Sequence, residues 1–261
     1  MITSILKNTR ILDGRAYIGL IAFALALNLE GASLETIILA MVAGVLYVAY
    51  SFAINNCFDV DTDSQNPQKH EKNPIASGEL SFTVGLASSA VIGLLGLIFA
   101  YFTNEVMFAI YSIMLGLSTF YSVPPRLKAK PFLDVLSHGI FFGALPFLFG
   151  AYVDGVLSRP ELIISIAIAL YSFALEIRNH LGDYESDLKA NLKTTPIVLG
   201  REKSQQLVFA FSLSAVLLLL YLVSPPFVIG ASILVVQREY RIFDATITML
   251  LLGYLLKAVV V

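Results

Sequence analysis

The sequence predicts an all-α integral membrane protein, built as a bundle of nine transmembrane helices. Of its 261 residues, 57% are hydrophobic and only 14% are charged, and the mean hydropathy is +0.79. A soluble domain usually has ~25% charged residues, so this composition excludes an ordinary soluble protein. Long apolar runs recur along the chain, and runs such as 37–48 and 207–222 do not alternate apolar and polar residues. Because barrel strands alternate with period two, these runs are expected to be helices.

Nine apolar runs, taken in chain order, give the expected spans. They cover residues 11–29, 34–58, 82–102, 105–123, 132–152, 161–181, 204–222, 225–237 and 244–261. An odd number of spans places the two termini on opposite sides of the membrane.

Basic residues indicate the orientation of the bundle. With the N-terminus inside, 15 of the 17 Lys and Arg residues fall on inside loops, and only Arg159 and Lys257 fall outside. The positive-inside rule therefore places the N-terminus and the long loops 59–81 and 182–203 in the cytoplasm of an integral cell-membrane protein. The net charge of −2 gives no reason to expect a nucleic-acid partner.

The two long loops begin with the same acidic pattern, in which an Asn and two Asp residues are four positions apart. Its members are Asn55, Asp59 and Asp63 after the second span, and Asn179, Asp183 and Asp187 after the sixth. On a helix, this spacing places each set on one face.

Each acidic pattern is followed by P-I-x-x-G, at 74–78 and at 196–200. The chain is therefore expected to be one transmembrane domain, 1–261, with an internal repeat at 55–63 and 179–187. The simplest architecture has two similar four-helix halves plus a ninth helix, and it brings both motifs to one cytoplasmic mouth.

Carboxylates gathered in this way repel one another unless a cation compensates them. Mg²⁺ prefers oxygen ligands and usually combines one or two carboxylates with substrate phosphates, so the motifs indicate a clamp for a diphosphate with more than one Mg²⁺. Basic residues near the motifs are suited to the remaining phosphate charge. They are Lys69, Lys72, Arg126, Lys128, Arg178 and Lys193. The apolar helices behind the clamp would hold a hydrocarbon tail. A substrate with a diphosphate head group and such a tail is an isoprenyl diphosphate.

An ion or solute transporter with acidic cytoplasmic gates is the alternative from another class. Repeated halves with paired acidic motifs occur in transporters, but their sites usually lie near the bilayer midplane. Here both motifs lie on cytoplasmic loops, which favours the enzyme.

Three segments resemble motifs of the UbiA superfamily of intramembrane prenyltransferases. The family pattern N-D-x-x-D-x-x-x-D matches 55–63, and D-x-x-x-D followed by K-T-x-P matches 183–196. Residues 121–128, Y-S-V-P-P-R-L-K, resemble the family's Y-S-x-P-P-x-x-L-K loop but have one residue fewer between P-P and L-K. Three positions depart from the pattern, since Asn56 replaces the usual Asp, Asn73 stands where many members have Arg, and Asn191 replaces a common Gly.

The resemblance implies a nine-helix fold and an Mg²⁺-dependent transferase. An isoprenyl group would move from an allylic isoprenyl diphosphate to a lipophilic acceptor, with release of pyrophosphate. The acceptor classes it allows are quinone precursors, glyceryl ether lipids, carotenoids and tetrapyrroles. The lipid bilayer would surround the bundle.

Site residues follow from the same resemblance. The metal ligands, for two or more Mg²⁺ ions, would be Asn55, Asp59, Asp63, Asp183 and Asp187. The diphosphate contacts would come from Lys72, Arg126, Lys128, Arg178 and Lys193. Asp59, Asp183 and Tyr121 would be catalytic, and the Tyr121 ring would face the allylic cation, as aromatic faces do for cations. The alternative for Tyr121 is an anchor at the membrane interface.

Other polar positions leave alternatives open. Asp61 and Glu185 lie on neighbouring helical faces, where they are either ligands or solvated residues. Asp134 and His138 face either the cavity or the cytoplasmic interface, and His138 is not expected to bind metal. Of the pair near the end of the sixth span, Arg178 is the better candidate for function than Glu176.

Overall fold

The structure is a computed structural model that describes residues 1–189, 191–224 and 239–260. Every regular element in these ranges is a helix. The helices are α1 (Ile2–Asn8), α2 (Arg15–Leu27), α3 (Leu34–Phe58), α4 (Val60–Asp63), α5 (Pro67–Lys72), α6 (Phe82–Tyr101), α7 (Glu105–Ser122), η1 (Leu127–Ala129), α8 (Leu133–His138), η2 (Gly139–Ala144), α9 (Leu145–Ala151), η3 (Tyr152–Asp154), α10 (Arg159–Gly182), α11 (Tyr184–Lys189), α12 (Thr195–Leu199), α13 (Arg201–Val223) and α15 (Tyr240–Val260). The expected span 225–237 lies outside the described residues.

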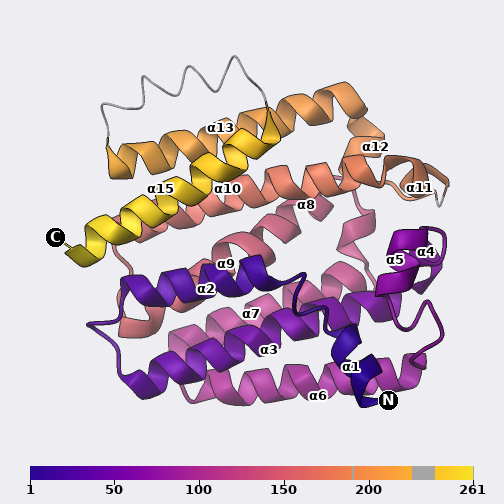
Figure 1. The fold of residues 1–261 in the computed structure, drawn as a ribbon, viewed down its shortest axis with the longest axis horizontal. Coiled ribbons are helices and arrows are strands. Elements are labelled where there is room, and N and C mark those ends of the chain that lie inside the picture. Colours follow the sequence, from indigo (N-terminus) through magenta and orange to yellow (C-terminus); the bar gives the residue numbers. More distant parts are fainter. Residues whose placement is uncertain (190, 225–238, 261) are drawn as a thin grey trace.

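The long helices lie roughly side by side along the molecule (Figure 1). On one side α3, α6 and α7 pack together, and on the other α10 packs on α13, which in turn packs on α15. Between them α2 packs on α9, and η2 packs on α10. The short helices α4, α5, α11 and α12 gather at one end, where the N-terminus also lies, and the C-terminus lies at the opposite end (Figure 1).

Seven helical segments in the described ranges are long and apolar enough to cross a membrane. They are Leu34–Phe58, Phe82–Tyr101, Glu105–Ser122, Leu133–Asp154, Arg159–Gly182, Arg201–Val223 and Tyr240–Val259. Each corresponds to an expected span. Many apolar side chains on α6 and α15, among them Leu94, Ile98 and Leu252, are exposed on the protein surface, which suits contact with lipid.

The first expected span is shorter in the structure than the sequence predicts. Its helix, α2, has 13 residues, so at ~1.5 Å per residue it is ~20 Å long, less than a ~30 Å hydrocarbon core. The chain turns before it, because Arg10 adopts a positive φ of 44° and its carbonyl accepts hydrogen bonds from the N–H groups of Asp13 and Gly14. The total of nine spans stays a prediction.

Side-chain caps fix where four of the long helices begin. Ser33, Ser81, Asn104 and Ser158 each accept a hydrogen bond from a backbone N–H in the first turn of the helix that follows. Such a cap satisfies one of the unpaired N–H groups at a helix start and stabilises it by ~1 kcal/mol. At Ser158, Glu161 completes a reciprocal capping box.

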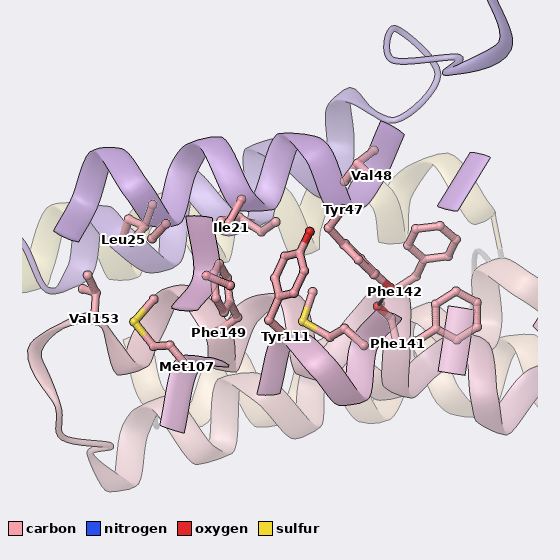
Figure 2. Packing of buried hydrophobic residues seen from close by; sticks show 14 residues of the cluster. Ile21, Leu25, Tyr47, Val48, Met107, Tyr111, Phe141, Phe142, Phe149 and Val153 are labelled. Carbon is pink, nitrogen blue, oxygen red and sulfur yellow. Dashed lines mark hydrogen bonds between the residues drawn. The ribbon is translucent and has the colours of Figure 1, made fainter. Parts of the chain in front are cut away.

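An aromatic cluster forms the core between α2, α3, α7 and α9 (Figure 2). Tyr47, Tyr111 and Phe149 are fully buried there. The Tyr47 hydroxyl donates a hydrogen bond of 2.6 Å to the carbonyl of Phe141 (Figure 2), so the polar atom of a buried ring is satisfied. Phe141 and Phe142 belong to this cluster and also line a cavity described below, and the core is therefore the floor of that cavity.

Glycines allow two close helix contacts. In η2, a Cβ on Gly139 would lie 2.0 Å from the Phe173 ring, and a Cβ on Gly143 would lie 2.9 Å from the Ser172 Cβ. Both positions therefore need glycine for η2 to pack this closely on α10. At Gly150 a Cβ would lie 2.8 Å from both the Ala24 Cβ and the Ile21 carbonyl oxygen of α2.

We expect Gly150→Ala to lower the apparent melting temperature in detergent, because the new methyl group pushes on the backbone of α2. Overpacking of this kind costs ~1–3 kcal/mol. Gly116→Ala is the matched control, since a Cβ there meets nothing within 4 Å and alanine favours a helix. Thermal unfolding followed by circular dichroism measures both, and equal melting temperatures would contradict the α2–α9 contact.

Candidate active site

A cavity of about 520 Å³ opens at the end of the bundle where α4, α5 and α11 lie. Its volume is in the usual range for small-molecule sites, ~300–1,000 Å³. All five predicted metal ligands line it: Asn55, Asp59, Asp63, Asp183 and Asp187. The fold therefore brings the two acidic motifs, more than 100 residues apart, to one mouth. Their role as ligands stays a prediction.

The first motif lies where one helix ends and the next begins. α3 ends at Phe58, Asp59 adopts φ −106° and ψ 8°, and α4 starts at Val60. The Asp63 N–H still donates to the Asp59 carbonyl at 2.8 Å. The spacing predicts one continuous helix, but the helix breaks at Asp59. The side chains of the motif still line one cavity.

The second motif follows the same local course. α10 ends at Gly182, Asp183 adopts φ −92° and ψ 4°, and α11 starts at Tyr184. The Asp187 N–H donates to the Asp183 carbonyl at 2.9 Å. In both motifs the first aspartate is therefore the residue at which the long helix stops.

The second aspartate of each motif is buried and held by a polar side chain just before P-I-x-x-G. Asn73 Nδ2 donates to Asp63 at 2.9 Å, and Thr194 Oγ1 donates to Asp187 at 3.4 Å. Gly78 and the equivalent glycine of the second copy, Gly200, have positive φ angles of 77° and 82°, a conformation that favours glycine. Gly200 is the residue directly before α13, and Gly78 lies three residues before Ser81, which caps α6. In both copies the turn therefore leads from the acidic motif into the next long helix.

Basic side chains compensate the first aspartates. Lys128 and Arg126 both bond to Asp59, the latter at 3.1 Å, and Lys128 Nζ also donates to Asn55 Oδ1 at 3.0 Å. Across the mouth, Lys69 Nζ lies 2.6 Å from Asp183 Oδ2. α5 thus reaches from the first acidic loop to the second motif.

The pKa shifts agree with this charge arrangement. Burial raises the pKa of Asp59, but Lys128 and Arg126 outweigh burial and hold it below its ordinary value. Burial lowers the pKa of Lys69, but its bond to Asp183 raises it overall. At Asp63, burial and the charge of Asp59 together raise the pKa. The negative charge of Asp63 is therefore less well compensated than that of Asp59.

Three predicted diphosphate contacts lie elsewhere or have other partners. Lys72 does not line the cavity and its Nζ lies 3.5 Å from Asp13. Arg178 lines the cavity but pairs with Asp244 of α15 at 2.7 Å. Lys193 is exposed and does not line the cavity. Lys69, one turn before Lys72, is the cation of this loop that reaches the mouth.

Several other positions have a clear place. Asp61 and Glu185 are exposed and outside the cavity lining, as expected for solvated residues.

Asn56 is fully buried and its amide donates to the Asn8 carbonyl at 3.0 Å, so the departure from Asp at this position removes no side chain from the mouth. Asp134 is buried at the contact with α12, where Thr195 N donates to it at 2.6 Å.

Deeper in the cavity the lining becomes aromatic. Phe52, Phe141 and Phe142 line it, together with Tyr17 and Tyr121. The Tyr121 ring centroid lies 5.0 Å from that of Phe141, so Tyr121 is a cavity residue rather than an interface anchor.

Two more polar residues lie in this inner part of the cavity. Glu176 accepts a hydrogen bond from the Tyr121 hydroxyl, and His138 lines the cavity beside them. Glu176 and Arg178 thus both line the cavity, but Glu176 bonds to Tyr121 within it whereas Arg178 pairs with Asp244, and no signal in the sequence distinguished the two.

The residues at the mouth fit Mg²⁺ held together with a diphosphate. In the described part of the chain, no three His, Cys, Asp or Glu side chains form a complete metal cage. The donors are all oxygen atoms, and Asp63 is a buried carboxylate under repulsion from Asp59. Mg²⁺ commonly uses one or two carboxylates and completes its shell with phosphate oxygens and water, which is what each motif offers.

A model of the UbiA prenyltransferase family matches residues 16–245. The chain belongs to this family. The match covers both acidic motifs and the helices that carry them, in agreement with the resemblance of the sequence motifs to the UbiA superfamily.

Individual relatives differ in what they are named for. A lycopene elongase/hydratase of Haloarcula japonica is 29% identical over 59% of this chain and 51% of that relative. A lycopene elongase/hydratase of Corynebacterium glutamicum is 28% identical over 75% of this chain and 70% of that relative. A digeranylgeranylglyceryl phosphate synthase of Methanococcoides burtonii is 28% identical over 77% and 73% of the two chains. The match to the first thus spans about half of the relative's length.

The fold is that of solved UbiA homologues. A homologue from Archaeoglobus fulgidus bound to DMAPP and Mg²⁺ superposes with a TM-score of 0.76, covers 99% of both chains and is 22% identical. A structure of a digeranylgeranylglyceryl phosphate synthase superposes with a TM-score of 0.72, at 21% identity, over 100% of this chain and 99% of that chain. At this identity the likeness shows the fold alone.

We expect Lys69→Met to weaken binding of inorganic pyrophosphate with Mg²⁺ about tenfold, because a charge-assisted hydrogen bond is worth ~1.5–3 kcal/mol. Lys72→Met, on the same short helix, is expected to have a much smaller effect. Isothermal titration calorimetry of both variants measures this. Equal weakening would instead support Lys72 as a phosphate ligand.

Proposed function

We propose that this protein is an Mg²⁺-dependent intramembrane prenyltransferase. It moves an isoprenyl group from an allylic isoprenyl diphosphate to a lipophilic acceptor and releases pyrophosphate. The observation that carries the proposal is one cavity with two acidic motifs and paired cations at its mouth and aromatic rings at its floor. A diphosphate head and an isoprenyl tail need these two environments in this order.

The head group is bound at the mouth. Asn55, Asp59 and Asp63 on one side, and Asp183 and Asp187 on the other, would hold more than one Mg²⁺ ion with the diphosphate. When bound, Mg²⁺ supplies positive charge that stabilises the leaving pyrophosphate.

Side chains of the chain itself do the remaining work. Lys69, Arg126 and Lys128, which lie beside Asp183 and Asp59, would contact the phosphate oxygens. The Tyr121 ring faces the allylic carbon and stabilises its developing positive charge. Phe52, Phe141 and Phe142 exclude water, which would otherwise capture the cation.

The proposal includes the arrangement in the membrane. The mouth and the N-terminus face the cytoplasm, because 15 of 17 Lys and Arg residues lie on that side in a nine-span topology. The two motifs belong to two similar halves of one domain, as supported by their shared helix break at Asp59 and Asp183. The acceptor is a quinone precursor, a glyceryl ether lipid, a carotenoid or a tetrapyrrole.

Purified protein incubated with Mg²⁺, an allylic diphosphate and a lipid extract is expected to release pyrophosphate and form a prenylated lipid. The donors to compare are dimethylallyl, geranyl, farnesyl and geranylgeranyl diphosphate, and mass spectrometry identifies the product. EDTA is expected to abolish the reaction and Mg²⁺ to restore it. Failure of all four donors would contradict the proposal and favour a transporter.

The aspartates provide the matched variants for this assay. Asp59→Asn or Asp183→Asn should reduce turnover at least ~10²-fold, because each removes a charge that acts in the transition state. Asp61→Asn, whose side chain is exposed outside the cavity, should retain most activity. Equal losses at Asp59 and Asp61 would contradict the assignment of the cavity face.

A further inference from the structure

Glu176 is a buried acid inside the cavity that the metal site does not use. It is 4% exposed and lines the cavity. It lies seven residues before Asp183, at which α10 stops, so its Cα is ~10 Å further along the helix axis from the mouth. His180 links its carboxylate to Asp187 at the mouth, with ring nitrogens 3.1 Å from Glu176 and 3.5 Å from Asp187. The carboxylate is therefore one histidine ring away from the second acidic motif.

Four side chains surround its two oxygen atoms. The Tyr121 hydroxyl donates to Oε1, and His180 Nε2 lies 3.1 Å from the same oxygen. Asn179 Nδ2 donates to Oε2 at 3.1 Å, and His138 Nε2 lies 3.4 Å from it. His138 is itself oriented by Ser172, whose Oγ lies 3.1 Å from Nδ1.

Burying an ionisable side chain in a membrane span costs free energy, so its presence indicates a function. Ionisable groups within membrane spans are rare, face the interior of the bundle and are by default functional. The fold also uses several elements to hold this one, since its partners come from α7, α8 and α10.

The direction of the Tyr121 bond is informative. An ionised carboxylate only accepts, so the phenol proton points at Glu176 and a lone pair of the phenol oxygen remains free. Ser122, the next residue, donates to the predicted metal ligand Asn55 at 3.1 Å. Tyr121 and Glu176 line the same cavity as Asn55 and Asp59, so the bond between the hydroxyl and the acid lies in the cavity that holds the predicted metal ligands.

We propose that Glu176 receives, through the Tyr121 hydroxyl, the proton that the prenyl acceptor gives up. In this step the bond between C1 and the diphosphate oxygen breaks and its electron pair leaves with pyrophosphate. The acceptor's electron pair forms the new bond to C1. The acceptor proton moves to the Tyr121 oxygen as the Tyr121 proton moves to Glu176 Oε1. This inference rests on the proposed function and adds a route for the proton.

The test compares the wild type with Glu176→Gln, Glu176→Asp and Tyr121→Phe, using Mg²⁺, geranylgeranyl diphosphate and a lipid extract. Mass spectrometry quantifies two products, the prenylated acceptor and the prenyl alcohol formed by water. Glu176→Gln and Tyr121→Phe should each lower kcat for the prenylated acceptor ~10²-fold, the usual size of general acid–base effects. The KM for the donor should change little, and Glu176→Asp should recover part of the loss.

Glu161→Gln is the matched control, because Glu161 is a buried acid (5% exposed) at the other end of α10, where it caps the helix. If Glu176→Gln reduces transfer no more than Glu161→Gln does, or Tyr121→Phe keeps the wild-type kcat, the inference is wrong. If Glu176→Asp is as inactive as Glu176→Gln, Glu176 is structural only. Absence of pyrophosphate release by the wild type would instead overturn the proposed function itself.

Discussion

The electrostatic balance at the mouth of the bundle is the constraint on which the rest of the site depends. Four aspartates from two loops converge on one cavity, and like charges at such distances disfavour ionisation unless cations offset them. Lys128 and Arg126 bond to Asp59, and Lys69 bonds to Asp183. Lys128 and Arg126 hold the pKa of Asp59 below its ordinary value, and the three cations lie where phosphate groups would need them.

The scaffold makes this balance possible. Each long helix stops at the first aspartate, and each second aspartate is buried against a side chain that precedes a P-I-x-x-G turn. Behind the mouth, the glycines of η2 let it pack against α10. That contact places His138 beside Glu176, so polar groups extend into the aromatic part of the cavity.

Much of this organisation could be predicted from the sequence, because it depends on local patterns. Composition and run length predict helical spans, and seven of the expected spans coincide with long apolar helices. The repeat of Asn and Asp at spacing four predicts that both motifs meet, since equivalent loops of a bundle lie at the same end. The short length of α2 could not be predicted from hydropathy. Residues 11–14 belong to the apolar run but form the turn after Arg10 and not the helix.

The positions of the basic residues depend on partners that are distant in the sequence, so their role as phosphate contacts stays a prediction. Lys69 and Lys72 lie on one short helix, and only the fold decides which faces the mouth. Arg178 is expected to approach the second motif, yet it pairs with Asp244, 66 residues later. Glu176 is two positions from Arg178 and both line the cavity, but nothing in the local pattern says that Glu176 bonds to Tyr121.

The most direct test of the central claim, that both motifs form a single metal–diphosphate site, is Mn²⁺ binding followed by electron paramagnetic resonance. Mn²⁺ replaces Mg²⁺ as the probe, with and without methylenediphosphonate as a stable diphosphate analogue. The charge balance predicts weak binding of Mn²⁺ alone, because lysine and arginine already bond to Asp59 and Asp183. The analogue should strengthen binding, and Asp59→Asn and Asp183→Asn should each remove that gain. Equal Mn²⁺ affinity with and without the analogue, or a gain that persists in Asp183→Asn, would contradict a shared site.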